Sequence, residues 1–206
     1  MDVSRPATCL LNALDAEVLA VLNRSAGPLS IREVHRLAST GSYDGIRLAL
    51  RRLSDGGLLR RDERGAGTFY ALNREHLAFP ALEGLLGLRR RLLSQAAAAI
   101  GEWPVLPRHA SFFGSFARGD GDAGSDLDVL VVFDDEVFGQ EALWADSVAS
   151  LAESLQQWTG NRAAIMAMGF DEIRAMAAGR RARPLWKALR AEAITIYGED
   201  LSRPAR

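Results

Sequence analysis

The sequence has few of the features that place a protein in a membrane or an oxidising compartment. Cys9 is the only cysteine among 206 residues, so no internal disulfide can form. No segment reaches the roughly 18 uninterrupted apolar residues that a membrane-spanning helix needs. The N-terminal stretch MDVSRPATCLLNALDAEV has acidic residues among its apolar ones and lacks the apolar core of a signal peptide. We therefore expect a cytoplasmic protein.

Lysine is almost absent as well, and the charge that is present is unevenly distributed. Lys187 is the only lysine, and arginine supplies the remaining positive charge. The net charge is +2 over residues 1–80, +2 over 81–108 and −5 over 109–206. With 48% hydrophobic and 25% charged residues the chain is globular, and its length suits one large domain or two small ones. The charge asymmetry predicts two parts with different partners.

Residues 1–80 predict three helices followed by a hairpin. Apolar residues recur at helical spacing in LLNALDAEVLAVLNR, in LSIREVHRLAST and in SYDGIRLALRRLSD. Ser30 with Glu33 matches a capping box, and Ser42 is a second candidate N-cap. The stretch LLRRDERGAGTFYALN then reads as two short strands around a glycine-rich turn.

This order resembles the winged helix-turn-helix domains of bacterial regulators of the MarR and ArsR type. In that family the third helix enters the major groove of DNA and the hairpin contacts the backbone. The resemblance implies a DNA-binding surface on the third helix and on the wing, made of Tyr43, Arg47, Arg51, Arg60, Arg61 and Arg64. Winged helices also serve as protein-interaction modules, and a net charge of +2 is far from the strong basic bias of a tight DNA binder.

Residues 81–105 predict one connecting helix, which ends at Gly101 and Pro104. Its three consecutive arginines, Arg89 to Arg91, fit a solvated helix face or a phosphate contact. The four alanines that follow fit packing against a partner helix or a second copy of the chain, or simply helix filler. A homodimer is therefore one open possibility.

Residues 106–206 contain the most informative stretch, FFGSFARGDGDAGSDLDVLVVF. It reads as a strand, a short helix, a loop and a second strand. The glycines match a dinucleotide-binding fingerprint literally, but that motif must follow a strand and open a helix, and here it precedes a strand. The continuation Gly119-Asp120 does not fit a P-loop, and Ser125 and Val131 stand where a calcium-binding EF-hand loop needs glycine and glutamate. All three generic motifs are excluded.

Asp126 and Asp128 are separated by one residue at the start of the second apolar strand. Residues i and i+2 of a strand point to the same face, so we expect the two carboxylates to converge. Adjacent carboxylates raise each other's pKa unless a cation lies between them, and Mg²⁺ suits that position. Upstream, Gly114 allows a close backbone approach, and Ser115 begins a helix whose free N–H groups favour an anion. A phosphate site followed by a metal site predicts a nucleoside triphosphate with Mg²⁺ or Mn²⁺.

This pattern resembles the minimal nucleotidyltransferases of the DNA polymerase β superfamily. The matching positions are Gly114, Ser115, Arg118, Gly119, Ser125, Asp126 and Asp128. The resemblance implies an α+β chain, in which the winged helix is joined by a long helix to a mixed-sheet nucleotidyltransferase domain. It also implies that Gly114, Ser115, Arg118 and Ser125 bind the nucleotide, and that Asp126 and Asp128 bind metal and take part in catalysis.

The sequence departs from that family at the third carboxylate, which normally comes from a neighbouring strand and can act as general base. The corresponding strand, NRAAIMAMGF, contains no Asp or Glu. Either Asp171 or Glu172 reaches back from the next helix, or the position is empty. Asp120 and Asp122 lie in a loop and are expected to be spectators.

Two functions follow. The first is transfer of a nucleoside monophosphate from a nucleoside triphosphate to an unknown acceptor. In the resembling family, relatives of this size in toxin–antitoxin pairs modify a partner protein, and others modify aminoglycosides. The second is a catalytically impaired regulator or antitoxin that binds nucleotide and DNA. Arg180, Arg181 and Arg183 are further candidates for nucleotide contacts.

Overall fold

The computed structural model describes residues 1–65, 67–178 and 183–200, and the chain divides into two compact units. One unit is Arg5–Leu88, and the other combines Met1–Ser4 with Arg89–Arg206. Each unit contains helices and one sheet, so the predicted α+β class is confirmed. Among the described helices, none has both the length and the apolar character needed to cross a membrane.

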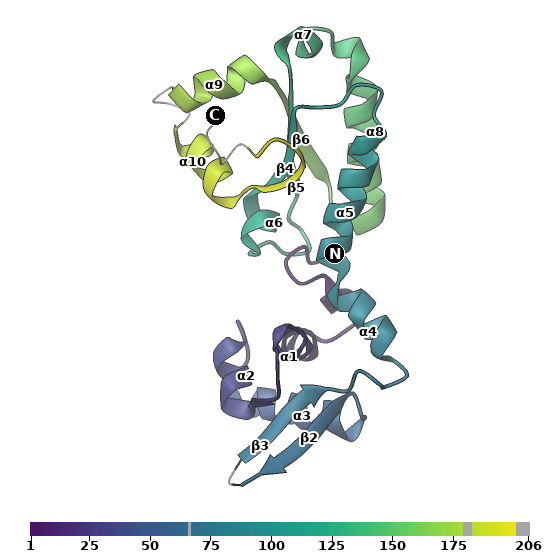
Figure 1. Cartoon of the computed structure of the whole chain (residues 1–206), viewed down its shortest axis with the longest axis vertical. Helices are drawn as coiled ribbons and strands as arrows, with labels where there is room; N and C mark the ends of the chain where they lie inside the picture. Colours follow the sequence, from purple (N-terminus) through teal and green to yellow (C-terminus); the bar gives the residue numbers. More distant parts are fainter. Residues whose placement is uncertain (66, 179–182, 201–206) are drawn as a thin grey trace. The chain divides into compact units, whose positions relative to one another are not determined.

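The first unit has the element order of a winged helix-turn-helix, as predicted. A short 3-10 helix, η1 (Pro6–Cys9), precedes α1 (Ala13–Arg24), β1 (Leu29–Ser30), α2 (Ile31–Leu37) and α3 (Tyr43–Asp55). The hairpin follows as β2 (Leu59–Arg64) and β3 (Gly67–Leu72), which are antiparallel (Figure 1). The two-residue β1 pairs with β3 and makes a third strand, so the order is β1-β3-β2.

Side-chain caps fix where the helices of this unit begin. The Ser30 hydroxyl accepts the Glu33 N–H at 3.3 Å, and the Glu33 carboxylate accepts the Ser30 N–H at 2.8 Å, which completes the predicted capping box of α2. Ser42 caps α3 as predicted, and Asn12 caps α1. The apolar faces then pack into one core that includes Val18, Leu22, Val34, Ile46, Leu50 and Tyr70.

The predicted single connecting helix is wrong in one respect, because the structure has two helices there. α4 (Phe79–Leu86) ends at Gly87, and α5 (Leu88–Gly101) begins directly after it. Glycine is a poor helix former because it loses the most backbone entropy on ordering, which accounts for the break. The predicted end at Gly101 is confirmed.

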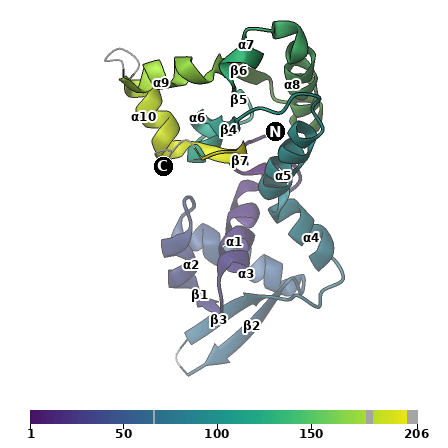
Figure 2. The same cartoon turned by 45° about the horizontal axis from the view of Figure 1, so that its top comes forward.

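The second unit is built on a four-stranded mixed sheet with the order β6-β5-β4-β7 (Figure 2). Its strands are β4 (His109–Phe113), β5 (Leu127–Phe133), β6 (Ala163–Gly169) and β7 (Ile194–Gly198). β5 and β6 are parallel, and the other pairs are antiparallel. The remaining elements are α6 (Gly114–Arg118), α7 (Asp135–Phe138), η2 (Glu141–Leu143), α8 (Ala145–Thr159), α9 (Phe170–Ala178) and α10 (Arg183–Glu192).

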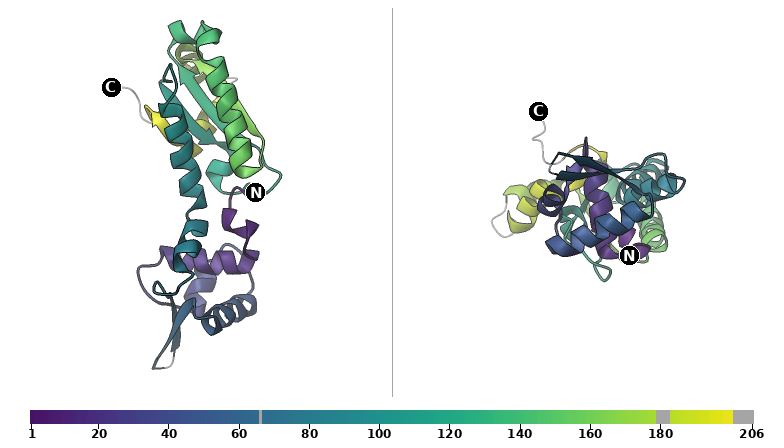
Figure 3. Two further views of the ribbon diagram at one scale, coloured as in Figure 1. Left: turned by 90° about the vertical axis from the view of Figure 1, so that its right-hand side faces the viewer. Right: turned by 90° about the horizontal axis from the view of Figure 1, so that it is seen from below.

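Helices cover both faces of this sheet. α5 and α8 run side by side on one face, and α9 and α10 lie on the other (Figures 1 and 3). Alternate residues of β5 divide between the two layers. Leu127, Val129, Val131 and Phe133 belong to the core that contains residues of α5 and α8, whereas Leu130 and Val132 pack with Ile173 and Leu189. Because β5 is covered on both faces, it reads in the sequence as an almost continuous apolar run.

Candidate functional site

The two aspartates singled out by the sequence lie at the beginning of β5, and Asp128 shares the α9 and α10 side of the sheet with Leu130 and Val132. Asp128 is paired with Phe113 of β4 and with Ala164 of β6, and Asp126 directly precedes the strand. Asp128 is half-buried and Asp126 is exposed. Burial raises the pKa of the Asp128 carboxyl, the neighbouring Asp126 raises it further, and Arg118 acts in the opposite direction. The charge of Asp126 therefore acts on the Asp128 carboxyl.

Gly114 allows the first turn of α6 to lie directly against Asp128. Its φ of +67° is in the left-handed region that disfavours other residues. A Cβ at this position would lie well inside 3.0 Å of the Asp128 carboxylate. Both the backbone conformation and the available space thus require glycine. The predicted phosphate-binding turn therefore lies in contact with the predicted metal ligand.

α6 has only five residues, from Gly114 to Arg118, and an arginine from another helix holds its C-terminal end. The Arg89 guanidinium donates hydrogen bonds to the carbonyls of Phe116 at 2.7 Å and Ala117 at 3.0 Å. It also lies 4.9 Å from the centroid of the Phe116 ring. Burial lowers the pKa of Arg89. Arg89 is therefore half-buried and bound to the end of α6, whereas Arg90 and Arg91 are exposed as expected for a solvated face.

Arg118 is exposed and lies between two acidic side chains. Its guanidinium donates to Asp120 at 3.0 Å and to Glu192, at the end of α10, at 2.9 Å. The hydrogen bond with Asp120, followed by that with Glu192, raises the pKa of Arg118. A phosphate at this position would compete with these two acids for Arg118 or bind the remaining N–H groups of its guanidinium.

Ser125 organises the loop that leads into Asp126. Its hydroxyl donates to the Asp122 carboxylate at 2.9 Å and accepts the Asp122 N–H, also at 2.9 Å. The Gly124 N–H donates to the same carboxylate at 2.9 Å. These bonds lower the pKa of Asp122, with the Ser125 side chain as the largest cause. Asp122 thus has a structural partner in Ser125, as Asp120 has in Arg118.

Asn161 connects this loop to the end of α8, and sequence reasoning did not find it. It is buried, and its amide nitrogen donates to the carbonyls of Ala123 at 3.2 Å and Ser125 at 3.0 Å. In the sequence Asn161 only follows Gly160, a glycine that ends α8 with a φ of +76°. That pattern indicates a helix end and gives no sign of a contact 36 residues away along the chain.

The third carboxylate is missing from the strand that should carry it. Ala164 is the β6 residue in register with Asp128, so the side chains that share its face are those of Ala164, Met166 and Met168. Asp171 and Glu172 lie beyond Gly169, the last residue of β6. Gly169 is five positions after Ala164 along the strand, a rise of about 16 Å.

Both acids are also engaged at that far end. The Glu172 carboxylate accepts the Gly169 N–H, and the Asp171 carboxylate lies 3.5 Å from the Arg174 guanidinium while its backbone N–H donates to Asp135. Of the two alternatives that the sequence left open, this arrangement favours an empty third position. Over the described residues, no group of three or more His, Cys, Asp and Glu side chains is arranged to hold a metal ion. Arg180 and Arg181, like the side chain of Arg183, lie outside the described part of the chain.

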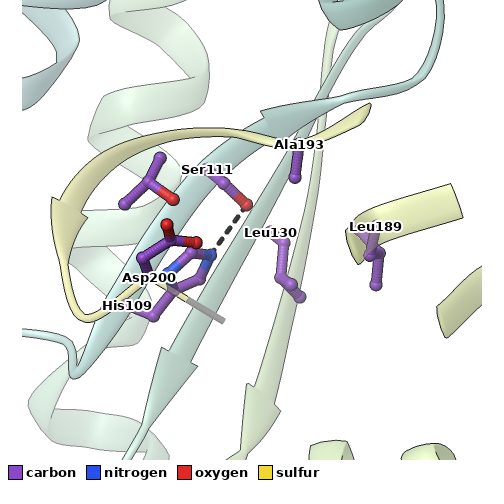
Figure 4. Close-up of a pocket in the computed structure, with 7 residues that line it drawn as sticks. His109, Ser111, Leu130, Leu189, Ala193 and Asp200 are labelled. Atoms are coloured by element: carbon purple, nitrogen blue, oxygen red, sulfur yellow. Dashed lines mark hydrogen bonds between the residues drawn. The ribbon is translucent and has the colours of Figure 1, made fainter. Parts of the chain in front are cut away.

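A second polar cluster lies further along the same sheet face, in a small pocket (Figure 4). The ring nitrogens of His109 lie 2.5 Å from the Glu199 carbonyl oxygen and 2.8 Å from the Ser111 hydroxyl. A carbonyl only accepts, so Nδ1 carries the proton and Nε2 accepts from Ser111. Burial lowers the pKa of His109, which favours the neutral ring.

The candidate DNA-binding residues are exposed, but each arginine has an acidic neighbour. Tyr43 is 46% exposed and makes an edge contact with the His35 ring. The pairs are Arg47–Asp44, Arg51–Asp55, Arg60–Glu75, Arg61–Glu63 and Arg64–Asp62. Exposed pairs of this kind contribute about 0–1 kcal/mol, so a DNA phosphate could replace the acid. The acids nevertheless cancel much of the positive charge of this surface.

Comparison with known proteins supports the assignment of the second unit. Residues 102–158 match the family model of the nucleotidyltransferase domain. This segment contains β4, α6 and β5, and therefore Gly114, Ser115, Asp126 and Asp128. No curated protein matches the chain.

Two solved structures show weak likeness. Human N-acetylserotonin methyltransferase in complex with SAM is 24% identical over 48% of this chain and 31% of its own, with a TM-score of 0.30, so the chain spans about a third of that enzyme. TrmBL2, an archaeal chromatin protein described as having a novel mode of DNA binding, is 15% identical over 86% of this chain and 75% of its own, with a TM-score of 0.32. At these scores neither likeness assigns a function.

Proposed function

We propose that the second unit binds a nucleoside triphosphate together with Mg²⁺ or Mn²⁺ and transfers the nucleoside monophosphate to an acceptor. The match of residues 102–158 to a nucleotidyltransferase domain supports nucleotidyl transfer in general. The observation that carries the specific proposal is the contact between Gly114 and Asp128, with Asp126 two residues before. Because Gly114 has no side chain, the backbone of this turn lies directly against a pair of carboxylates that repel each other.

These residues fit a divalent cation. A cation between Asp126 and Asp128 would relieve the repulsion that raises the pKa of Asp128, and carboxylate oxygens are the ligands that Mg²⁺ prefers. When bound, the cation would neutralise charge on the triphosphate. The backbone at Gly114 and Ser115 would hold the terminal phosphates, and Arg118 would offset their charge once released from Asp120 or Glu192. Ser125 would act by shaping the loop before Asp126.

In the reaction, a hydroxyl oxygen of the acceptor forms a bond to the α-phosphorus. The bond to the pyrophosphate oxygen breaks, and pyrophosphate leaves with the electron pair. The hydroxyl proton goes to solvent, because β6 carries no carboxylate in register with Asp128. General-base assistance is worth roughly 10²–10⁴ in rate, so we expect slow turnover. The acceptor is a hydroxyl group of a small molecule or of a partner protein, such as a toxin.

The acid-free β6 favours a second candidate, a regulator or antitoxin that binds nucleotide without rapid turnover and binds DNA through the winged helix. The exposed arginines of α3 and β2 support it, and their acidic partners argue for weak, strongly salt-dependent binding.

Incubation with an α-³²P-labelled nucleoside triphosphate and Mg²⁺ or Mn²⁺ separates the two functions. A candidate acceptor is added, and the Asp126→Ala, Asp128→Ala double variant is run beside the wild type. Label transferred by the wild type and not by the variant supports the enzyme. Metal-dependent nucleotide binding without transfer supports the regulator, and absence of both would refute the nucleotide site itself.

DNA binding is tested independently by gel shift at several salt concentrations. We expect the Arg47→Ala, Arg51→Ala double variant to weaken any shift. The matched control is Arg90→Ala with Arg91→Ala, which removes two exposed arginines from α5. Equal binding by both double variants would contradict the assignment of α3 as the DNA-contacting helix.

A further inference from the structure

Asp126 lies outside the regular hydrogen bonding of the sheet, although its position decides whether the site can hold a cation. β5 begins at Leu127, so Asp128 is fixed by its neighbours on β4 and β6 whereas Asp126 follows a loop. Asp126 is also exposed, so packing does not fix its side chain. Another group must hold its backbone if the two carboxylates are to bind one ion.

The turn after α8 supplies that support on both sides of Asp126. On one side, the Asn161 amide nitrogen donates to the carbonyls of Ala123 and Ser125. On the other, the Leu127 N–H donates to the Arg162 carbonyl at 2.8 Å. Asp126 is thus the single residue between two backbone anchors that come from consecutive residues of the same turn.

Asn161 is itself fixed in place. It is 3% exposed, its N–H donates to the Thr159 hydroxyl at 3.1 Å, and its side-chain oxygen accepts from the amino group of Met1 at 3.0 Å. With the oxygen so engaged, both donors of the amide point to the loop. The bonds between Ser125 and Asp122 are internal to the loop and shape it, but they do not attach it to the rest of the unit.

We infer that Asn161 is a positioning residue that holds Asp126 beside Asp128 for binding of a divalent cation. This inference rests on the proposed function. Groups that orient a metal ligand without touching the metal typically change metal affinity by about 10–100-fold when removed. We therefore expect Asn161→Ala to weaken cation binding by at least about tenfold, while Asp126 and Asp128 are both still present.

The test uses Mn²⁺ alone, whose free form is measured by electron paramagnetic resonance while the full-length protein is titrated. We expect one saturable site in the wild type that the Asp126→Ala, Asp128→Ala variant lacks, and a weakened site in Asn161→Ala. The matched control is Asn73→Ala, which removes another amide that donates to a backbone carbonyl, that of Gly57 at 2.9 Å, in the other unit. This control should bind Mn²⁺ like the wild type.

Unfolding is followed in parallel, because loss of a buried asparagine also lowers stability. A purely structural role would lower the unfolding midpoint of Asn161→Ala and leave the Mn²⁺ affinity of the folded protein unchanged, and that result would overturn the inference. Asn161→Ser keeps one hydrogen-bond donor, so its Mn²⁺ affinity should lie between those of the wild type and Asn161→Ala. If Asn161→Ala does not fold, the serine variant is measured in its place. If the wild type itself has no Mn²⁺ site, the proposed function fails and the inference fails with it.

Discussion

Replacing Gly114 with alanine tests the contact on which the nucleotide site depends. Two costs arise together. The φ of +67° places alanine in the left-handed region, which costs roughly 1–2 kcal/mol. The new Cβ would also overlap the Asp128 carboxylate, and overpacking of this kind costs roughly 1–3 kcal/mol. We expect Gly114→Ala to destabilise the second unit by about 2–5 kcal/mol.

Gly160 provides a matched control for stability because its φ is +76° and no atom lies within 4 Å of the position its Cβ would take. Gly160→Ala should therefore show only the backbone cost, roughly 1–2 kcal/mol. Urea unfolding followed by tryptophan fluorescence measures both, because all four tryptophans come after Arg89 and so report on the second unit alone.

Binding of nucleotide with Mn²⁺ is measured on the same Gly114→Ala protein under conditions where it is folded. Asp128 must rotate or shift to accommodate the methyl group, so we expect loss of binding. Gly65→Ala, at a positive φ in the wing with no atom within 4 Å, should bind normally. Equal stability of the Gly114 and Gly160 variants, together with unchanged nucleotide binding, would refute the reasoning.

Three further changes test the electrostatics of the second unit. Because the pKa of Asp128 is raised in the folded protein, its negative charge lowers the stability of the fold above that pKa. Asp128→Asn should therefore raise the urea midpoint at pH 7 without metal, and this advantage should disappear at low pH. Addition of Mg²⁺ should stabilise this variant less than the wild type. Glu192→Gln should remove one of the two acidic charges paired with Arg118 and tighten nucleotide binding in a titration by up to about fivefold, and weaker binding would contradict the competition. Burial lowers the pKa of His109, so its contribution to stability should be constant above about pH 6.5 and fall below that pH, where the unfolded chain takes up a proton on this ring. If His109→Gln leaves the pH profile of stability unchanged, the fall belongs to other groups.

The features that the sequence predicted well depend on local signals. The capping box of Ser30 and Glu33 is contained within four residues, and the apolar run of β5 is interrupted only by Asp128, so both could be located without tertiary information. Asp128 could be placed on a strand next to the glycine turn because the apolar run that contains it is a local signal. Gly114 could be identified because glycine commonly marks a close approach of the backbone.

The features that it missed depend on contacts between distant segments. Arg89 looks the same in the sequence as Arg90 and Arg91, and only the packing of α5 places it on the end of α6. Asn161 supports the loop before Asp126 from the other end of a long helix. The break at Gly87 was missed because the helical pattern continues on both sides of it.

The most direct measurement is a crystal structure with Mn²⁺ and a nucleoside triphosphate analogue that cannot be cleaved between the α- and β-phosphates. We expect an anomalous peak from Mn²⁺ in contact with both Asp126 and Asp128, with the terminal phosphates against the backbone of Gly114 and Ser115. A nucleotide bound elsewhere, or Mn²⁺ absent from the two carboxylates at saturating concentration, would contradict the assignment of this site.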